Sequence, residues 1–133
     1  MPSTDPVADL LSALSNASRV SKERTVVPDS KFTRAILQAL QAEGFIRSFR
    51  APGGKGPSRR IEISLAYGPK RERLLNGARR VSRPGRRVYV GVGELKPFAR
   101  SLETVLLSTP QGVLTGAQAF ARKTGGEFLC QVW

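Results

Sequence analysis

The sequence of 133 residues contains no histidine and a single cysteine, Cys130. The absence of histidine excludes a serine–histidine catalytic triad, a histidine general base and a histidine metal ligand. One cysteine excludes an intrachain disulfide and a cysteine-cluster zinc site, so a reducing compartment is the default expectation. Because Cys130 lies in an apolar stretch, we interpret it as a small buried side chain and not as a nucleophile.

Long hydrophobic runs are also missing, since every apolar stretch is far shorter than the roughly 20 residues that a transmembrane helix needs. Residues 1–17 have no basic segment and contain Asp5 and Asp9. This composition argues against a secretory signal and against an arginine-rich transit peptide. The sequence therefore predicts no membrane partner.

Acidic residues are scarce, with 10 Asp and Glu against 22 Lys and Arg, and the net charge at pH 7 is +12. The excess is concentrated in residues 47–87, where 13 basic residues face only Glu62 and Glu72. Arginine, whose planar fork binds phosphate through two parallel hydrogen bonds, outnumbers lysine 16 to 6. This pattern predicts a large polyanion as partner, with nucleic acid ahead of an anionic membrane. We expect no catalytic site, metal, cofactor or small-molecule substrate.

The first part of the chain is predicted to alternate helices and strands. Asp5 suits the N-cap of an amphipathic helix over residues 5–18, and Pro6 suits its first position. A short β-prone piece at 25–27 precedes a second helix, which Asp29 or Ser30 caps and Gly44 ends. Strands are predicted at residues 45–50 and 61–66, joined by a glycine-rich hairpin loop at residues 51–58. We place a boundary at Gly68, which gives an N-terminal subdomain over residues 1–68.

The second part, residues 69–133, is predicted to be a β-rich subdomain with short helices, which makes the fold class α+β. Pro84-Gly85 suits a type II turn, and a strand over 86–90 would follow it. Leu95, Phe98 and Leu102 have the spacing of one short helical face. The sequence pattern also predicts a strand over 104–109, a helix that Thr115 caps and that runs to residue 121, and a last strand over 128–132.

The turn around Pro84-Gly85 is the best candidate site from the residues alone. It would project Arg83, Arg86 and Arg87, and Tyr89 would share a strand face with Arg87. Cations can bind phosphate while an aromatic ring accepts an unstacked base, so this combination favours RNA binding. The alternative is a solvated basic hairpin with Tyr89 packed on a neighbour.

Two further segments, residues 108–112 and 125–127, carry small side chains that would let a ligand approach the backbone. Each also fits an ordinary strand end, and both interpretations stay open.

Segments spread along the chain match a known pattern in the right order, at residues 5–11, 16–17, 27–32, 43–46, 80–90, 107–109, 112–115, 125–130 and Trp133. With these segments the sequence resembles the bacterial-type family of small-subunit ribosomal protein eight. The resemblance implies a two-domain α+β protein that binds the central domain of small-subunit ribosomal RNA and helps to organise it during assembly. The implied partners are that RNA and other small-subunit ribosomal proteins, in a ribosome of the bacterial cytoplasm or of an organelle matrix.

The resemblance also implies which residues meet RNA: Ser30, Lys31, Arg83, Arg86, Arg87, Tyr89, Ser108, Thr109, Gly112, Gly125, Gly126 and Glu127. The C-terminal members of this set would meet an irregular RNA core, largely in its minor groove, and Ser30 and Lys31 a second RNA helix. Pro110 and Gln111 depart from the family pattern, which usually has serine and lysine there. This departure indicates either a remodelled contact or an atypical ribosomal RNA partner. A free regulatory RNA binder and a metal-dependent nuclease are the other function classes considered.

Overall fold

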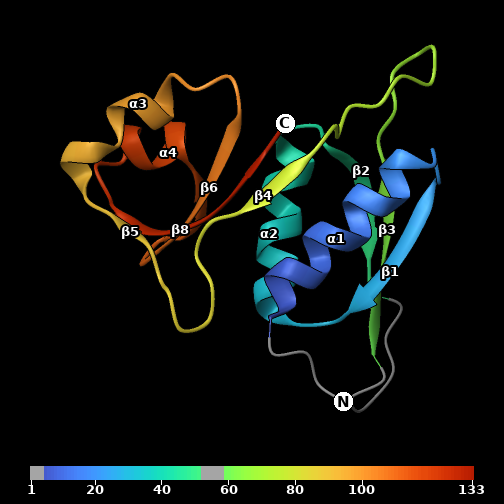
Figure 1. Ribbon diagram of the computed structural model, residues 1–133, viewed down its shortest axis with the longest axis horizontal. Helices are drawn as coiled ribbons and strands as arrows, with labels where there is room; N and C mark the ends of the chain where they lie inside the picture. Colours follow the sequence, from blue (N-terminus) through green and yellow to red (C-terminus); the bar gives the residue numbers. More distant parts are fainter. Residues whose placement is uncertain (1–4, 52–58) are drawn as a thin grey trace. The chain divides into compact units, whose positions relative to one another are not determined.

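The computed structural model describes residues 5–51 and 59–133, which form two compact units, Met1–Gly77 and Ala78–Trp133 (Figure 1). Most of the hairpin loop predicted at 51–58 lies outside the described residues. The division falls nine residues beyond the Gly68 boundary that the sequence suggested. The intervening residues belong with the N-terminal unit because Arg73 Nε donates to the buried Ser18 Oγ (3.2 Å), and that hydroxyl donates to the Leu75 carbonyl.

The N-terminal unit has the predicted order of helix, strand, helix, strand, strand. Its elements are α1 (Pro6–Arg19), β1 (Arg24–Pro28), α2 (Lys31–Ala42), β2 (Ile46–Arg50) and β3 (Arg60–Leu65). The strands form an antiparallel sheet in the order β1-β3-β2, and α1 and α2 cover one face of it (Figure 1). This arrangement confirms the α+β fold class for the first part of the chain.

Local sequence signals explain where these elements begin and end. The Asp5 carboxylate accepts a hydrogen bond from the Ala8 N–H (3.2 Å), and Ser30 Oγ accepts one from the Thr33 N–H (3.1 Å), so Ser30 is the cap of α2. Gly44, with a φ of +86°, follows α2 in the left-handed conformation that glycine adopts without steric cost. Alternate residues of β3 are buried, as the period of a half-buried strand requires.

The C-terminal unit is β-rich with short helices, as predicted. Its elements are β4 (Ala78–Arg80), β5 (Tyr89–Val90), the 3₁₀ turn η1 (Val92–Glu94), α3 (Lys96–Ala99), β6 (Thr104–Thr109), β7 (Gly112–Thr115), α4 (Gly116–Ala121) and β8 (Gly126–Val132). The sheet order is β4-β8-β6-β7, and β5 also pairs with β8. Strand β8 therefore pairs directly with three other strands, β4, β5 and β6.

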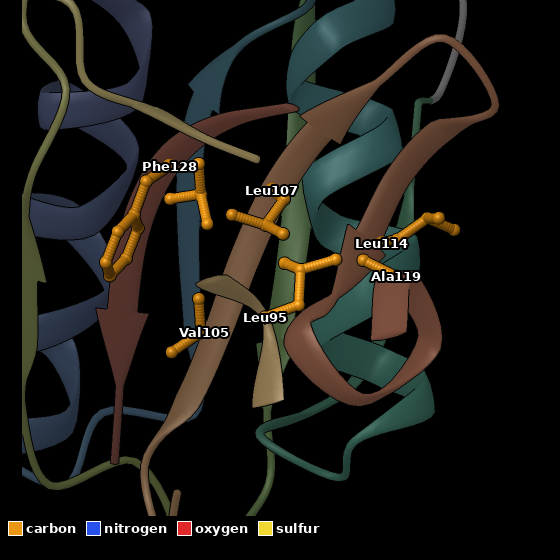
Figure 2. Packing of buried hydrophobic residues seen from close by; sticks show 7 residues of the cluster. Leu95, Val105, Leu107, Leu114, Ala119 and Phe128 are labelled. Atoms are coloured by element: carbon orange, nitrogen blue, oxygen red, sulfur yellow. The ribbon is translucent and has the colours of Figure 1, made fainter. Parts of the chain in front are cut away.

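The core of this unit lies between the sheet and the short helices. Leu95, Leu107 and Ala119 are fully buried there, and Val90, Val105, Leu114 and Phe128 complete the cluster (Figure 2). The rings of Phe98 and Phe128 meet edge to face at 5.0 Å. Burying one such large apolar side chain contributes about 1.5–3 kcal/mol, so this cluster stabilises the packing of the short helices on one face of the sheet.

The structure corrects three sequence expectations. Helix α3 is only four residues long, so Leu102 is fully exposed and does not share its buried face. The strand expected over 86–90 is reduced to β5, because Arg86 pairs back with Arg83 across the turn. Strand β7 was not predicted, since four residues carry too little alternation to be recognised. In the described part of the chain, no helix is long and apolar enough to cross a membrane.

Candidate RNA interface

The Pro84-Gly85 turn has the conformation that its residues predict. The Arg86 N–H donates to the Arg83 carbonyl (2.9 Å), and Gly85 has a φ of +82°. A type II turn requires positive φ at this third position and favours proline before it. The side chains of Arg83 and Arg86 therefore project into solvent from a backbone whose geometry is closed by hydrogen bonds on both sides.

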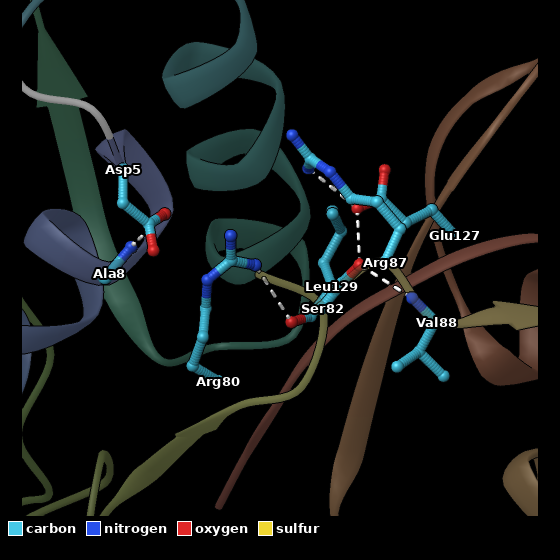
Figure 3. A network of polar contacts seen from close by, with 8 residues as sticks. All are labelled: Asp5, Ala8, Arg80, Ser82, Arg87, Val88, Glu127 and Leu129. Carbon is cyan, nitrogen blue, oxygen red and sulfur yellow. Dashed lines mark hydrogen bonds and ion pairs between the residues drawn. The ribbon is translucent and has the colours of Figure 1, made fainter. Parts of the chain in front are cut away.

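A polar network anchors this turn to β8 (Figure 3). Ser82 is fully buried, and its hydroxyl donates to Glu127 Oε2 (2.6 Å) and accepts from the Val88 N–H (3.0 Å). Arg87 donates to the same carboxylate oxygen at 3.0 Å. Glu127 thus joins both ends of the turn to the sheet and holds Arg87 in place. Ser82 is a residue that sequence reasoning missed, because no pattern distinguishes a buried serine from an exposed one beside a turn.

Strand register brings three of the predicted residues into one row across the sheet. Tyr89 of β5 pairs with Glu127 of β8, and Glu127 pairs on its other side with Ser108 of β6. Directly paired residues point to the same face of a sheet. Tyr89 is 69% exposed, so its ring is available on the surface and not packed in the core. Within the described residues the Ser108 hydroxyl has no hydrogen-bond partner.

Gly125 and Gly126 allow this row to form. A Cβ at Gly125 would lie 2.4 Å from the Val90 carbonyl oxygen, and one at Gly126 would lie 2.2 Å from the Ser108 carbonyl oxygen. Contacts this short are not tolerated, so only glycine lets β8 approach both β5 and β6. These two residues act by bringing backbones together and offer no side chain to a ligand.

The hairpin over residues 108–112 uses its own hydroxyl to close. Thr109 Oγ1 donates to the Gly112 carbonyl (2.8 Å) and accepts from the Gln111 N–H (3.1 Å). Gly112 has a φ of +110°, which a residue with a side chain rarely adopts. Thr109 and Gly112 therefore shape the hairpin, and Ser108 is the hydroxyl left to contact a ligand.

Ser30 and Lys31 belong to the N-terminal unit, whereas the other predicted residues belong to the C-terminal unit. The Ser30 hydroxyl caps α2 and donates to Thr33 Oγ1 (2.8 Å), while Lys31 is exposed at the start of the helix. The neighbouring Asp29 forms an ion pair with Arg34. Its hydrogen bond to Arg34 lowers the pKa of Asp29, so this carboxylate stays charged close to Lys31.

Charge in the C-terminal unit is strongly unbalanced. The unit contains nine basic and three acidic residues, a net charge of +6. Of the three acids, Glu127 is bound to Arg87, and neither Arg83 nor Arg86 has a carboxylate partner among the residues described. The turn therefore presents two unneutralised guanidinium groups beside an exposed ring.

Cys130 and the acidic residues are the candidate groups for nucleophilic or metal chemistry in this chain. Burial raises the pKa of Cys130 to about 12, so its thiol stays protonated and unreactive at neutral pH. Among residues 5–51 and 59–133, no group of three cysteine or acidic side chains could hold a metal ion.

Fold and surface together define a small, strongly basic α+β protein of two units, with unneutralised arginines of the kind that nucleic-acid-binding proteins present. A family model described as Ribosomal protein S8 matches residues 5–133. The chain therefore belongs to the ribosomal protein S8 family, and the resemblance seen in the sequence is confirmed.

Curated relatives agree over nearly the whole length. The small ribosomal subunit protein uS8 of Thermus aquaticus is 46% identical over 98% of this chain and 99% of its own. The protein of the same name from Aster yellows witches'-broom phytoplasma is 43% identical over the full length of both chains. That from Sorangium cellulosum is 42% identical over 98% of this chain and 98% of its own.

Proposed function

We propose that this protein is a structural constituent of the small ribosomal subunit that binds the central domain of small-subunit ribosomal RNA directly. The names and bacterial sources of its relatives support a place in that subunit. The observation that carries direct RNA contact is the row Tyr89–Glu127–Ser108, which lies beside a turn with two unneutralised arginines. By holding one arrangement of the RNA, the protein supports its folding and the assembly of the subunit.

Each group in the row has a separate task. Arg83 and Arg86 bind phosphates and contribute affinity that depends on salt. The exposed ring of Tyr89 stacks on an unpaired base or covers a ribose. The Ser108 hydroxyl, which can donate and accept, binds a base edge or a 2′-hydroxyl in the shallow minor groove. Phosphate contacts position the protein, and the groups on the sheet face select the RNA.

The remaining predicted residues support this contact or add a second one. Gly125, Gly126 and Glu127 build the row, and Thr109 and Gly112 shape the hairpin that carries Ser108. Lys31, at the positive end of α2, would bind the backbone of a second RNA helix near the Ser30 cap. Other small-subunit ribosomal proteins would be its neighbours, in a ribosome of the bacterial cytoplasm, as the sources of the relatives suggest.

A double substitution at the turn tests this function. Arg83→Ala with Arg86→Ala removes two exposed cations and leaves the backbone hydrogen bonds of the turn in place. Binding to a central-domain fragment of small-subunit ribosomal RNA should weaken, and the log–log salt slope should fall by about one per lost phosphate contact. The matched control is Lys96→Ala with Arg100→Ala, which removes the same charge from α3 and the residue after it.

Two results would contradict the proposed function. Equal losses in both double variants would mean that only net charge matters and would remove the turn as a site. The native protein should also remain with small subunits when they are sedimented at high salt. A protein that instead stays in the supernatant would be a free RNA binder and not a ribosomal constituent.

A further inference from the structure

The sheet of the N-terminal unit has a second face, opposite to α1 and α2. Register places Arg24 of β1, Ser64 of β3 and Ser48 of β2 in one row across this face. The next row contains Val26, Glu62 and Arg50. Arg24, Ser48 and Arg50 are exposed, and Val26 is 48% exposed. The face is therefore polar, rich in arginine, and left uncovered by the helices of its own unit.

Two adjoining hollows follow this face. The smaller, of about 240 Å³, is lined by residues of all three strands, including Ser48 and Arg50. The larger, of about 480 Å³, lies where β1 and β2 begin and β3 ends, and Arg47 and Arg71 line it. Both hollows share Arg24 and Ser64. Together they form a continuous depression with serine hydroxyls at its floor.

The acidic residues of this depression are already neutralised. Glu62 is bound by Arg50 at 2.8 Å, and Glu23 by Arg71 at 3.7 Å. Arg24 and Arg47, in contrast, have no carboxylate within ion-pair distance in the part of the chain that the structure describes. They come from the two edge strands, on either side of β3, and neighbouring strands lie about 4.8 Å apart. The depression thus has an excess of two positive charges separated by the width of the sheet.

We propose that this open sheet face is a further RNA surface, in addition to the contacts of the C-terminal unit and of Lys31. Arg24 and Arg47 each bind there a phosphate of a backbone that the protein does not read in sequence. This inference rests on the proposed function, because it assigns RNA as the polyanion. Serine hydroxyls and guanidinium groups suit phosphate oxygens. The aromatic side chains that line the depression, Phe49 and Tyr67, are only partly exposed, and the Arg71 guanidinium lies over the Tyr67 ring, so neither offers a base a free stacking surface. The face therefore contributes attraction and orientation, while base selection stays with the C-terminal unit.

The test uses the full chain with Arg24→Gln and Arg47→Gln together. The matched control is Arg19→Gln with Arg100→Gln, two exposed arginines outside both surfaces. Binding is measured against salt on a central-domain fragment of small-subunit ribosomal RNA and on an unrelated RNA duplex. For the sheet-face variant we expect the salt slope to fall by about two on both RNAs. The factor by which affinity falls between 50 and 200 mM salt should accordingly become about tenfold smaller. The ratio of the affinity for the ribosomal RNA fragment to the affinity for the unrelated duplex should not change.

The results that overturn the inference differ from those that overturn the proposed function. An unchanged slope, or a slope that falls equally in the control, would remove the sheet face as an RNA surface. Unchanged RNA binding with lost binding to a polyglutamate peptide would assign the face to an acidic protein segment instead. If the native protein shows no preference for the ribosomal fragment over the duplex, the proposed function itself fails.

Discussion

The N-terminal and C-terminal units carry the same net charge, +6 each, but they hold their cations in different ways. In the N-terminal unit, Arg24 and Arg47 extend from the two edge strands, Arg47 at an irregularity of β2, with no carboxylate to fix them among the described residues. In the C-terminal unit, a carboxylate held by a buried serine fixes Arg87 at 3.0 Å and ties the turn to the sheet. The difference indicates that charge suffices to attract a polyanion, whereas selecting one requires charges, ring and hydroxyl in a fixed arrangement.

The largest expected effect comes from breaking the close approach of strands in the C-terminal unit. Gly126→Ala places a methyl group against the Ser108 carbonyl, so β8 and β6 must separate. We expect the free energy of unfolding to fall by about 3 kcal/mol and RNA affinity to fall with it. Gly44→Ala in the N-terminal unit meets no atom within 4 Å. It should cost only about 1 kcal/mol, from its positive φ. Urea unfolding measures both, and equal losses would refute the special role of this contact.

Removing the buried hydroxyl of Ser82 should have the next largest effect. Ser82→Ala leaves the Val88 N–H without its acceptor and leaves Glu127 Oε2 with Arg87 as its remaining donor. We expect a loss of about 2 kcal/mol in stability. RNA affinity should fall as well, because the turn is no longer fixed. Ser18→Ala removes a comparably buried hydroxyl from the N-terminal unit. It should lower stability without weakening RNA binding once the protein is folded, and a parallel loss of RNA affinity would contradict the division of roles.

Substitution of Tyr89 should change RNA affinity without changing the stability of the fold. Its ring is mostly exposed, so Tyr89→Ala should change the unfolding free energy little while weakening RNA binding by roughly 1–3 kcal/mol. Tyr89→Phe keeps the ring and should retain most of the affinity. Titration of the ribosomal RNA fragment with both variants checks this prediction. If the alanine variant binds as well as the native protein, the ring is not a stacking platform.

At neutral pH the smallest effect is that of Cys130, whose titration changes stability only in alkaline solution. Burial raises its pKa to about 12 from an ordinary value of 9.0, so above pH 9 the unfolded chain loses a proton that the folded chain keeps. Stability present below pH 9 should therefore decline by about 1.4 kcal/mol per pH unit as the pH rises toward 12. Unfolding from about pH 8 to about pH 11 measures the decline. Cys130→Ala should flatten this part of the profile, and an unchanged slope would mean that other groups cause it.

The sequence was sufficient for most of the fold because the signals are local. Asp5, Ser30 and Thr115 cap the helices that follow them, and each accepts the hydrogen bond that a cap provides. Strand β6 covers the predicted residues 104–109, with the buried apolar run Val105–Leu107 inside it. Leu102 shows where this reasoning stops, since a helical spacing does not reveal that the helix ends three residues earlier.

The candidate site was only partly readable in the sequence. Arginines, a turn and a tyrosine within one short segment indicated a binding surface directly. The role of Glu127 as an anchor was not predictable, because its partners Ser82 and Arg87 lie 45 and 40 residues away. Likewise, no local pattern revealed that the Thr109 hydroxyl closes its own hairpin through Gly112 and Gln111.

By itself, the sequence determined the charge, the absence of histidine and the order of helices and strands, because composition and short-range periodicity do not depend on the fold. Only the tertiary structure decided which residues share a surface. Strand register aligned Tyr89, Glu127 and Ser108 from three separate segments. Two glycines let the backbones approach closely enough for this row to exist, and long-range pairing of this kind leaves no mark in any single stretch of sequence.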